Sequence, residues 1–300
     1  MKSKNGDVAV AGVELTHPSR VLYPEQGITK GDLARYYERI AEWILPHLEG
    51  RPLTLVRCPG GHNKECFYQR HPRAASSEAI NSLAVRENGK VARYLSVDSL
   101  PGLVALVQMG TLELHTWGAR MPNLDRPDRM IFDLDPAEDV DWQDIAAGAK
   151  RLRAHLQDLN LGAFVKTTGG KGLHIVVPIA PKQSWTVVKD FSRALAEFMA
   201  RQNPDRYIAT MSKTKRSGKI FIDYLRNNRT ATAVSAYSTR ARAGAPVSVP
   251  LRWQELQKDL RGRFTIRNVP DRLARLKKDP WQDYEAMRRP LAAELLSRLK

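Results

Sequence analysis

The sequence predicts an α+β fold in which antiparallel and mixed β-sheets are flanked by helices. Strand-like and helical stretches follow one another without a regular βαβ alternation, and several acidic residues fall inside strand-like stretches. The chain has 300 residues, 42% of them hydrophobic, which is enough to bury a core as one large domain or two joined modules. Because Gly118, Pro122 and Pro127 cluster, we expect one domain built of two fused modules, residues 1–125 and 126–300.

The clearest predicted helix covers residues 29–48. Thr29 can cap it and Asp32 completes a capping-box pattern, while apolar residues recur at helical spacing along its length. Pro46 and Gly50 indicate its end. Further along the first module we expect strands at residues 53–57 and 65–70 and a mixed segment around residues 100–117.

The second module contains apolar strands and helices in mixed order. Residues 130–135 read as a strand interrupted by acids, and a glycine-rich turn at residues 169–172 joins two further strands. The last forty residues read as helical and charged. The remaining elements are helices expected near residues 142–158 and 184–201 and strands expected at residues 163–167, 173–179 and 219–225.

The chain is strongly basic. Lys and Arg total 48 against 32 Asp and Glu, which gives a net charge of +16 and a pI near 10.0. Such an excess favours a polyanionic partner through phosphate contacts and counterion release. A basic pI can also serve solubility alone, but here the charge is spread from Arg20 to Lys300, which is typical of a folded, groove-like surface. Nucleic acid is the leading candidate partner.

Neither membrane insertion nor a disulfide framework is indicated. No segment approaches the ~18 uninterrupted apolar residues of a membrane span, and no apolar core follows the first four residues, so we expect an intracellular, soluble protein. Only two cysteines occur, and two buried thiols are the favoured interpretation. The less favoured alternative is a zinc site made by Cys58, His62, Cys66 and His71.

Three aspartates suggest a metal-dependent site. Asp133 and Asp135 lie two apart on a strand and therefore point to the same face, and Asp223 interrupts a second apolar strand. Adjacent carboxylates repel each other unless cations neutralise them, and Asp oxygens suit Mg²⁺ or Mn²⁺. The pattern predicts a two-metal phosphoryl-transfer site. A turn-capping role for the acidic pair alone is the structural alternative, since Pro136 follows.

A glycine-rich turn could hold phosphate. The segment from Thr167 to His174 offers free backbone N–H groups, two hydroxyls, the Lys171 ammonium and an imidazole. It does not follow the Walker pattern, in which Lys and then Ser or Thr come directly after the second glycine of the motif and open a helix. The alternative is an ordinary glycine-rich hairpin, but His174 beside the predicted metal site favours a triphosphate-binding role.

Basic and aromatic side chains surround these motifs in the sequence. Guanidinium groups suit phosphates, and aromatic rings can stack on bases, although solvated charge and core packing are the simpler roles for many of them. The basic cluster contains Lys213, Lys215, Arg216, Lys219, Arg226, Arg229, Arg240 and Arg242, and the candidate stacking residues are Phe67, Tyr68, Trp117 and Tyr237.

Three motifs resemble the catalytic motifs of the archaeo-eukaryotic primase superfamily. They are DLDP at residues 133–136, GGKGLH at 169–174 and IFIDYLRN at 220–227. More narrowly, the chain resembles the polymerase domain of bacterial DNA ligase D over about residues 13 to 290. That narrower resemblance is carried by LTHPSRVLYPEQGITKGDLARYYERIA at 15–41, ELHTWGAR at 113–120 and RARAGAPVSVPLRWQEL at 240–256.

The resemblance implies a primase-type fold with catalytic carboxylates on sheet strands, and it implies a role for each matching residue. Thr168 stands where a serine is common in the family, so a hydroxyl is kept. The implied metal ligands are Asp133, Asp135 and Asp223; the implied nucleotide-binding residues are Thr168, Lys171, His174, His115, Arg226 and Arg240; and Arg20, Lys30 and Phe67 are implied to bind the 5′-phosphate and stack near the template.

The implied activity is addition of ribonucleotides, or less readily deoxynucleotides, to DNA 3′ ends at gaps and breaks in non-homologous end joining. Two divalent cations, Mn²⁺ or Mg²⁺, would serve it, with nucleoside triphosphates as substrates. Ligase and phosphoesterase domains of the same enzyme and the Ku protein are the implied partners, and the implied location is cytoplasmic and nucleoid-associated. Two alternatives stay open: a DNA end-binding module without catalysis, and a DxD phosphohydrolase, although Ala137 departs from the DxDxT pattern usual there.

Overall fold

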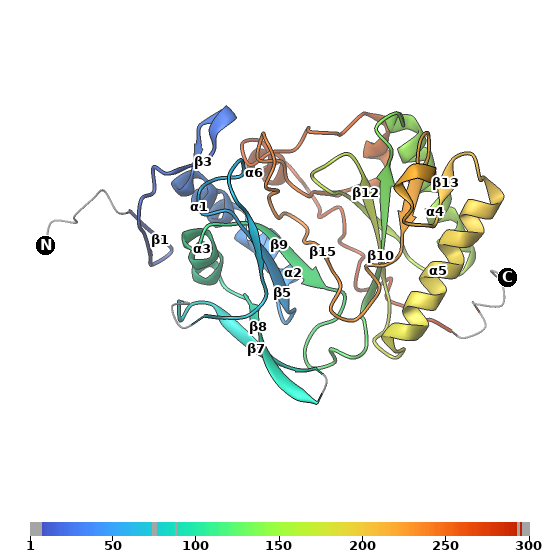
Figure 1. The fold of residues 1–300 in the computed structure, drawn as a ribbon, viewed down its shortest axis with the longest axis horizontal. Coiled ribbons are helices and arrows are strands. Elements are labelled where there is room, and N and C mark those ends of the chain that lie inside the picture. Colours follow the sequence, from blue (N-terminus) through green and yellow to red (C-terminus); the bar gives the residue numbers. More distant parts are fainter. Residues whose placement is uncertain (1–7, 74–76, 88, 293–294, 296–300) are drawn as a thin grey trace, which may run out of the picture. The chain divides into compact units, whose positions relative to one another are not determined.

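The computed structural model describes residues 8–73, 77–87, 89–292 and 295. The chain divides into two compact units that do not follow the sequence order (Figure 1). Unit 1 contains the chain up to Thr116 together with Val234–Ser248 and Gly262–Leu276. Unit 2 contains Trp117–Ala233, Val249–Arg261 and the chain from Lys277 onward.

Unit 1 is built around an antiparallel sheet in which β5 lies between β6 and β9. The helix α1 packs against α3 beside this sheet. The elements of unit 1 are β1 (Val8–Val10), β2 (Val13–Leu15), β3 (Val21–Tyr23), η1 (Pro24–Gln26), β4 (Ile28–Thr29), α1 (Lys30–Arg39), α2 (Ala41–Leu48), β5 (Leu53–Arg57), β6 (Phe67–Gln69), β7 (Asn81–Glu87), β8 (Lys90–Ser96), α3 (Leu100–Gln108), β9 (Thr111–Trp117) and α6 (Val269–Ala274).

The helix predicted over residues 29–48 is present but divided in two. The capping box is confirmed: the Thr29 hydroxyl accepts a hydrogen bond from the Asp32 N–H, and the Asp32 carboxylate accepts one from the Thr29 N–H. The chain then leaves helical geometry at Ile40, with φ −118° and ψ 14°, and α2 begins one residue later. Pro46 lies inside α2 instead of ending it, whereas Gly50, with φ +68°, does follow the helix end.

The prediction of two free buried thiols is wrong, because Cys58 and Cys66 form a disulfide with an S–S distance of 2.04 Å. The physical reason is strand pairing. Arg57 of β5 is the direct partner of Phe67 of β6, so the two cysteines stand one residue beyond that pair, with Cα atoms 4.3 Å apart. Since each sulfur is bonded to the other, neither is a thiolate, and the alternative zinc site lacks its two sulfur ligands.

A hairpin formed by β7 and β8 was not predicted. Its seven paired positions run from Asn81 opposite Ser96 to Glu87 opposite Lys90. The sequence does carry a signal for it, since Asn-Gly at positions 88–89 is a typical two-residue hairpin connection.

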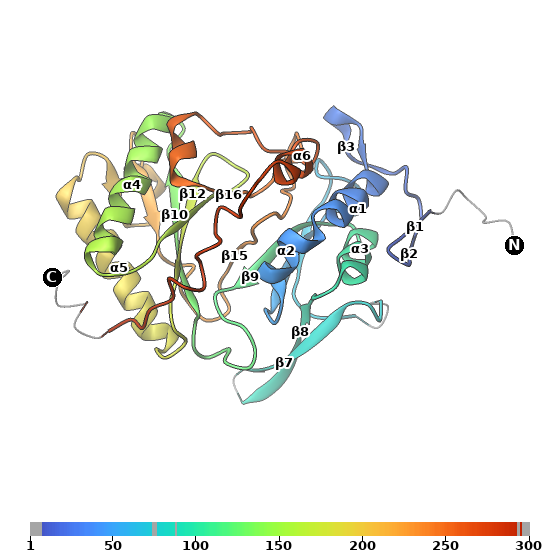
Figure 2. The ribbon, with the colours of Figure 1, turned by 180° about the vertical axis from the view of Figure 1, so that it is seen from behind.

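Unit 2 contains a six-stranded sheet whose order is β13-β14-β10-β12-β11-β16. All neighbours in it are antiparallel except β13 and β14. The helices α4 and α5 cover the same side of this sheet (Figures 1 and 2). The elements are β10 (Arg129–Pro136), α4 (Trp142–Asp158), β11 (Phe164–Thr167), β12 (Leu173–Pro178), α5 (Trp185–Gln202), β13 (Tyr207–Ile208), η2 (Lys213–Lys215), β14 (Ile220–Asp223), β16 (Pro250–Leu251) and η3 (Trp253–Gln257). The strand β15 (Thr232–Val234) ends in unit 1, where it pairs with β9 at the edge of the sheet that contains β5.

The prediction that the last forty residues are helical is wrong. In the described part of that segment, α6 is the only α-helix, and turns follow it. Prolines recur at positions 270, 280 and 290, and a proline in a helix interior removes a backbone hydrogen bond. Instead, Trp281 is buried against Ile131, Phe164, Val176 and Ala233, and its indole N–H donates to the Val165 carbonyl at 3.1 Å. This segment therefore completes the core of unit 2.

No helix in the described ranges is both long enough and apolar enough to span a membrane.

Candidate active site

The central feature of unit 2 is a row of polar side chains across four neighbouring strands. Asp133 on β10 is the direct partner of Asp223 on β14 and, on its other side, of His174 on β12. His174 is in turn the partner of Lys166 on β11. Because direct partners on neighbouring strands point to the same face, these four side chains form one line. The two acidic segments and the strand after the glycine turn are therefore brought together as predicted.

Asp135 lies on the same face as this row. It stands two residues beyond Asp133 on β10, so its side chain points the same way. Its carboxylate is about half exposed, at 45%, whereas those of Asp133 and Asp223 are 16% and 11% exposed. The three predicted carboxylates thus gather on one face at the centre of the sheet.

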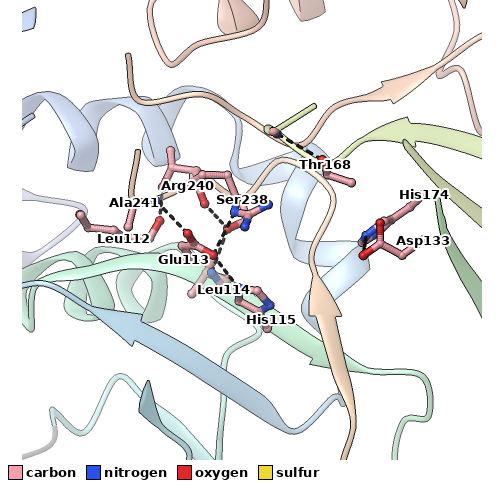
Figure 3. Close-up of polar contacts among 12 residues, drawn as sticks. Leu112, Glu113, Leu114, His115, Asp133, Thr168, His174, Ser238, Arg240 and Ala241 are labelled. Carbon is pink, nitrogen blue, oxygen red and sulfur yellow. Dashed lines mark hydrogen bonds and ion pairs between the residues drawn. The ribbon is translucent and has the colours of Figure 1, made fainter. Parts of the chain in front are cut away.

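The buried His174 faces Asp133, with Nε2 and Oδ2 3.5 Å apart (Figure 3). Burial and the charge of Lys166 lower the pKa of His174 to about 4, against an opposing effect of Asp133. Burial acts to raise the pKa of Asp133, but His174, Arg226 and Lys166 outweigh it and the pKa is lowered. At neutral pH the pair is therefore a neutral imidazole beside an ionised carboxylate.

The other two carboxylates have raised pKa values. For Asp135 the causes are burial and then the charge of Asp133. For Asp223 burial is the main cause, and Asp133 and Asp135 add to it against the opposing effects of Arg226 and the Leu225 N–H. A raised carboxyl pKa means that the ionised form is destabilised. The cluster therefore gains free energy from any cation placed beside it.

Two arginines supply positive charge to the cluster. Arg226 lies between two of the carboxylates, with Nη2 3.7 Å from Asp133 Oδ2 and Nε 3.3 Å from Asp223 Oδ2. Arg216 lies with Nη1 3.1 Å from Asp135 Oδ2, and its guanidinium stacks 4.0 Å above the Phe221 ring. Sequence reasoning placed Arg216 only in a general basic cluster, and missed Lys166 altogether because a lysine inside an apolar strand carries no signal of its own.

The donor set fits divalent cations that prefer oxygen. Three carboxylates share one face, and a guanidinium already bridges two of them. Among the residues that the structure describes, however, no three acidic, histidine or cysteine side chains converge as they stand into a site that could hold a metal ion. The reason is that each carboxylate is turned toward an arginine or His174. Asp133, Asp135 and Asp223 are the side chains on this face whose oxygens could hold such cations.

The glycine-rich turn closes on itself beside the row. The Thr168 N–H and hydroxyl both donate to the Gly172 carbonyl, at 3.3 and 3.2 Å, and the hydroxyl accepts from the Gly170 N–H at 3.2 Å. Gly169 has φ +69°, a conformation that favours glycine. Lys171 pairs with the exposed Glu138 at 2.6 Å. Since such exposed ion pairs are worth little, Lys171 can leave Glu138 for a phosphate at small cost.

In unit 1, His115 and Arg240 meet at a residue that sequence reasoning missed. Both contact the carboxylate of Glu113, His115 through Nε2 at 2.7 Å and Arg240 through Nε at 2.9 Å (Figure 3). The available signal was the pair Glu113-Leu-His115, whose alternation on a strand puts both polar side chains on one face.

The three residues assigned to 5′-phosphate and template contacts also lie in unit 1. Arg20 is exposed, and its carbonyl accepts from the Lys30 N–H at 2.8 Å. Lys30 is only 4% exposed and donates through Nζ to the Thr16 carbonyl at 2.8 Å and to Gln108 Oε1 at 3.2 Å. Burial and the charge of Arg20 lower the pKa of Lys30. Phe67 begins β6, with the guanidinium of Arg57 5.1 Å from its ring centre.

The sequence matches the LigD primase-polymerase domain family over residues 29–281. It is 40% identical over 294 residues to the multifunctional non-homologous end joining protein LigD of Pseudomonas aeruginosa. The aligned region covers 97% of this chain and 35% of that protein. It is 33% identical to the LigD of Mycolicibacterium smegmatis, covering 87% of this chain and 34% of that one. The chain thus spans about a third of the length of these relatives.

The fold also matches a solved structure, the polymerase domain of Mycobacterium tuberculosis ligase D in complex with DNA. The TM-score is 0.85 with 31% sequence identity, over 91% of this chain and 98% of that one. This match confirms the predicted α+β, primase-type fold. The family match likewise confirms the prediction of a polymerase-type nucleotidyltransferase. The chain belongs to the LigD primase-polymerase domain family.

Proposed function

We propose that this domain adds nucleotides, ribonucleotides in preference to deoxynucleotides, to DNA 3′ ends at gaps and double-strand breaks during non-homologous end joining. The observation that carries the proposal is the row of His174, Asp133 and Asp223 across three neighbouring strands, with Asp135 on the same face. Nucleotidyl transfer needs carboxylates that hold cations beside groups that bind a triphosphate, and this face offers both.

In unit 2 the carboxylates would bind the cations and the glycine-rich turn would bind the triphosphate. Asp133, Asp135 and Asp223 would hold two divalent cations, Mn²⁺ or Mg²⁺, which supply charge neutralisation and activation of the 3′-hydroxyl. His174 Nε2 lies 3.5 Å from Asp133 Oδ2, and its N–H would donate to a phosphate oxygen once cations hold the Asp133 carboxylate. The Thr168 hydroxyl and the Lys171 ammonium would bind the triphosphate, and Arg226 would leave the carboxylates for the nucleotide phosphates.

Unit 1 would recognise the nucleotide, the 5′-phosphate and the template strand. His115 and Arg240 are the residues to which we assign nucleotide binding there. Arg20 and Lys30, held together by the Lys30 N–H bond to the Arg20 carbonyl, would bind the 5′-phosphate at the far side of a gap, and Phe67 would stack near the template strand. Partners in the wider reaction would be ligase and phosphoesterase domains of the same enzyme and the Ku protein, and DNA as substrate would place the domain at the nucleoid.

The test of the proposal is primer extension on a short-gapped duplex with a 5′-phosphate, in the presence of Mn²⁺. Parallel reactions with ribo- and deoxynucleoside triphosphates measure the sugar preference. We expect extension that favours ribonucleotides. An absence of extension while the protein still binds the duplex would replace this proposal by the non-catalytic end-binding module, and hydrolysis of a phosphomonoester without any template would favour the phosphohydrolase.

Manganese is expected to stabilise the protein against heat through the three carboxylates. A ligand at 100 times its dissociation constant stabilises the folded state by about 2.7 kcal/mol, which corresponds to a rise of about 5 °C in Tm for a domain of this size. Differential scanning fluorimetry with and without MnCl₂ measures this. The rise should vanish in Asp133→Asn/Asp135→Asn and persist in Asp158→Asn, an exposed aspartate at the end of α4. An equal rise in all three proteins would place the bound Mn²⁺ elsewhere.

Arg20→Ala is expected to remove the advantage of a 5′-phosphate. A charged hydrogen bond to phosphate contributes about 1.5–3 kcal/mol, so binding to the phosphorylated gap should weaken about tenfold or more. Binding to the same gap with a 5′-hydroxyl should change little. Fluorescence anisotropy on the two duplexes measures the difference, with Arg39→Ala as control because Arg39 is equally exposed and pairs only with Asp271 among the contacts described. Equal weakening on both duplexes would show that Arg20 contacts DNA without reading the phosphate.

A further inference from the structure

Glu113 is a buried carboxylate at the centre of the cluster that joins His115 and Arg240. Its side chain is 8% exposed. Its Oε2 lies 2.7 Å from His115 Nε2 and 2.9 Å from Arg240 Nε (Figure 3). Its Oε1 accepts a hydrogen bond from the Ala241 N–H at 2.8 Å. One carboxylate therefore contacts both residues of unit 1 to which we assign nucleotide binding, and also the backbone that follows Arg240.

The carboxylate stays ionised at any working pH. Burial acts to raise the pKa of Glu113, but the hydrogen bond from His115, the charge of Arg240 and the Ala241 N–H outweigh it and lower the pKa to about 2. A buried charge is tolerated only when it is paired and hydrogen-bonded, and the partners of this carboxylate are His115, Arg240 and the Ala241 N–H.

The segment carrying Arg240 is attached to β9 by other bonds as well. The Ser235 N–H donates to the Leu114 carbonyl at 2.8 Å, the Leu114 N–H donates to Ser238 Oγ at 2.8 Å, and the Thr239 hydroxyl donates to the Leu112 carbonyl. Backbone attachment of the segment therefore does not depend on Glu113 alone. Glu113 also contacts two polar side chains that approach it from different parts of the chain.

We propose that Glu113 is a positioning residue that fixes the His115 imidazole and the Arg240 guanidinium as a pair of nucleotide-binding groups. This inference rests on the proposed function, in which the two groups bind the incoming nucleoside triphosphate. Two long, polar side chains lose rotamer freedom on binding a ligand, and a carboxylate that holds both in place beforehand removes that cost. Glu113 would touch no substrate atom and would act through its two partners.

The first measurement is the binding of ATP in the presence of Mn²⁺, followed by isothermal titration calorimetry. Glu113→Gln keeps the size of the side chain and an acceptor oxygen but removes the charge. We expect ATP binding to weaken about tenfold, and the KM for ATP in primer extension to rise by a similar factor, with kcat within about twofold of the wild type. Glu42→Gln, an exposed glutamate on α2, is the matched control and should change neither constant.

The second measurement separates positioning from simple stabilisation of the fold. Glu113→Gln is added to a His115→Ala/Arg240→Ala background. If Glu113 acts through these two partners, the added change leaves kcat/KM within about twofold of that background. A merely structural role predicts that the loss adds to the background, and it predicts a fall in kcat that follows the thermal unfolding midpoint.

The outcomes also distinguish this inference from the proposed function. A wild-type protein that extends primers and binds ATP, with Glu113→Gln equal to it, overturns the positioning role and leaves the proposed function standing. Additive loss in the background overturns the positioning role in the same way. A wild-type protein that neither binds ATP nor extends a primer overturns both.

Discussion

Asp133→Asn and Asp135→Asn are each expected to reduce nucleotide addition by at least about a thousandfold. Removing a single preorganised electrostatic contact commonly costs 10²–10³ in rate, and each of these carboxylates is assigned to hold the cations that neutralise the transferring phosphates. Asparagine has nearly the same shape, so the strand pairing of Asp133 with Asp223 and His174 should persist.

The effect is measured as single-turnover primer extension at saturating Mn²⁺ and nucleotide. Asp158→Asn on the exposed end of α4 is the control and should retain wild-type rates. Folding is checked by thermal unfolding. Asp135→Asn should not be less stable, because the pKa of Asp135 is raised by burial and by the charge of Asp133. Asp133→Asn should lose some stability, because His174, Arg226 and Lys166 lower the pKa of Asp133 and thus stabilise its charge. Retention of more than a tenth of the wild-type rate in Asp133→Asn, with folding intact, would remove this carboxylate from the catalytic role.

The second large effect is expected from Gly172→Ala. A Cβ at this position would clash with the Leu134 carbonyl oxygen, which belongs to the backbone between Asp133 and Asp135. Backbone cannot rotate away as a side chain can, so β12 and β10 would have to separate at the point where His174 meets Asp133. We expect a loss of about 3 kcal/mol in the free energy of unfolding, at the upper end of overpacking effects, together with loss of nucleotide addition.

Urea unfolding followed by fluorescence measures the stability change. Gly60→Ala is a matched control, since the added Cβ would meet no backbone atom and only Cβ and Cγ of Lys64, at 3.2 and 3.3 Å. That variant should lose less than about 1 kcal/mol, as surface substitutions usually do. Equal stability of Gly172→Ala and wild type would show that the two strands can move apart at this point without cost.

The central strands and helices of unit 2 could be predicted from the sequence because their signals are local. The helix expected near residues 142–158 is α4 with the same bounds, and the acidic strand expected at 130–135 is β10 with one further residue at each end. Apolar periodicity and capping residues are sufficient for such elements. The division at Ile40 was not predictable, because it is a change of backbone angles at a residue that fits the helical pattern.

The disulfide and the glutamate cluster could not be predicted for a different reason. Whether Cys58 and Cys66 bond depends on the register of β5 against β6, which the sequence does not state. Glu113 and Arg240 are 127 positions apart, and they meet only because residues 234–248 return to unit 1 after Trp117–Ala233 of unit 2. Such pairings depend on tertiary structure, and no local sequence pattern predicts them.

The common face of Asp133, Asp223 and His174 could be predicted from the motifs, but the orientation of the side chains on it could not. The residue types and the strand-like surroundings predicted that the three side chains lie on one face. In the observed register, Asp223 on β14 and His174 on β12 are the direct partners of Asp133 on β10. The sequence could not predict that the carboxylates are paired with Arg226 and Arg216, because that pairing depends on the rotamers of two long side chains in the folded protein.

The most direct test of the central claim is a crystal structure with Mn²⁺ and a non-hydrolysable ribonucleoside triphosphate, measured at the manganese absorption edge. We expect anomalous peaks bound by Asp133, Asp135 and Asp223, the triphosphate on His174 and Lys171, and Arg226 withdrawn from the carboxylates. Anomalous peaks absent from this face, with the three carboxylates still paired to Arg226 and Arg216 while the nucleotide is bound elsewhere, would contradict the assignment of this row as the catalytic site.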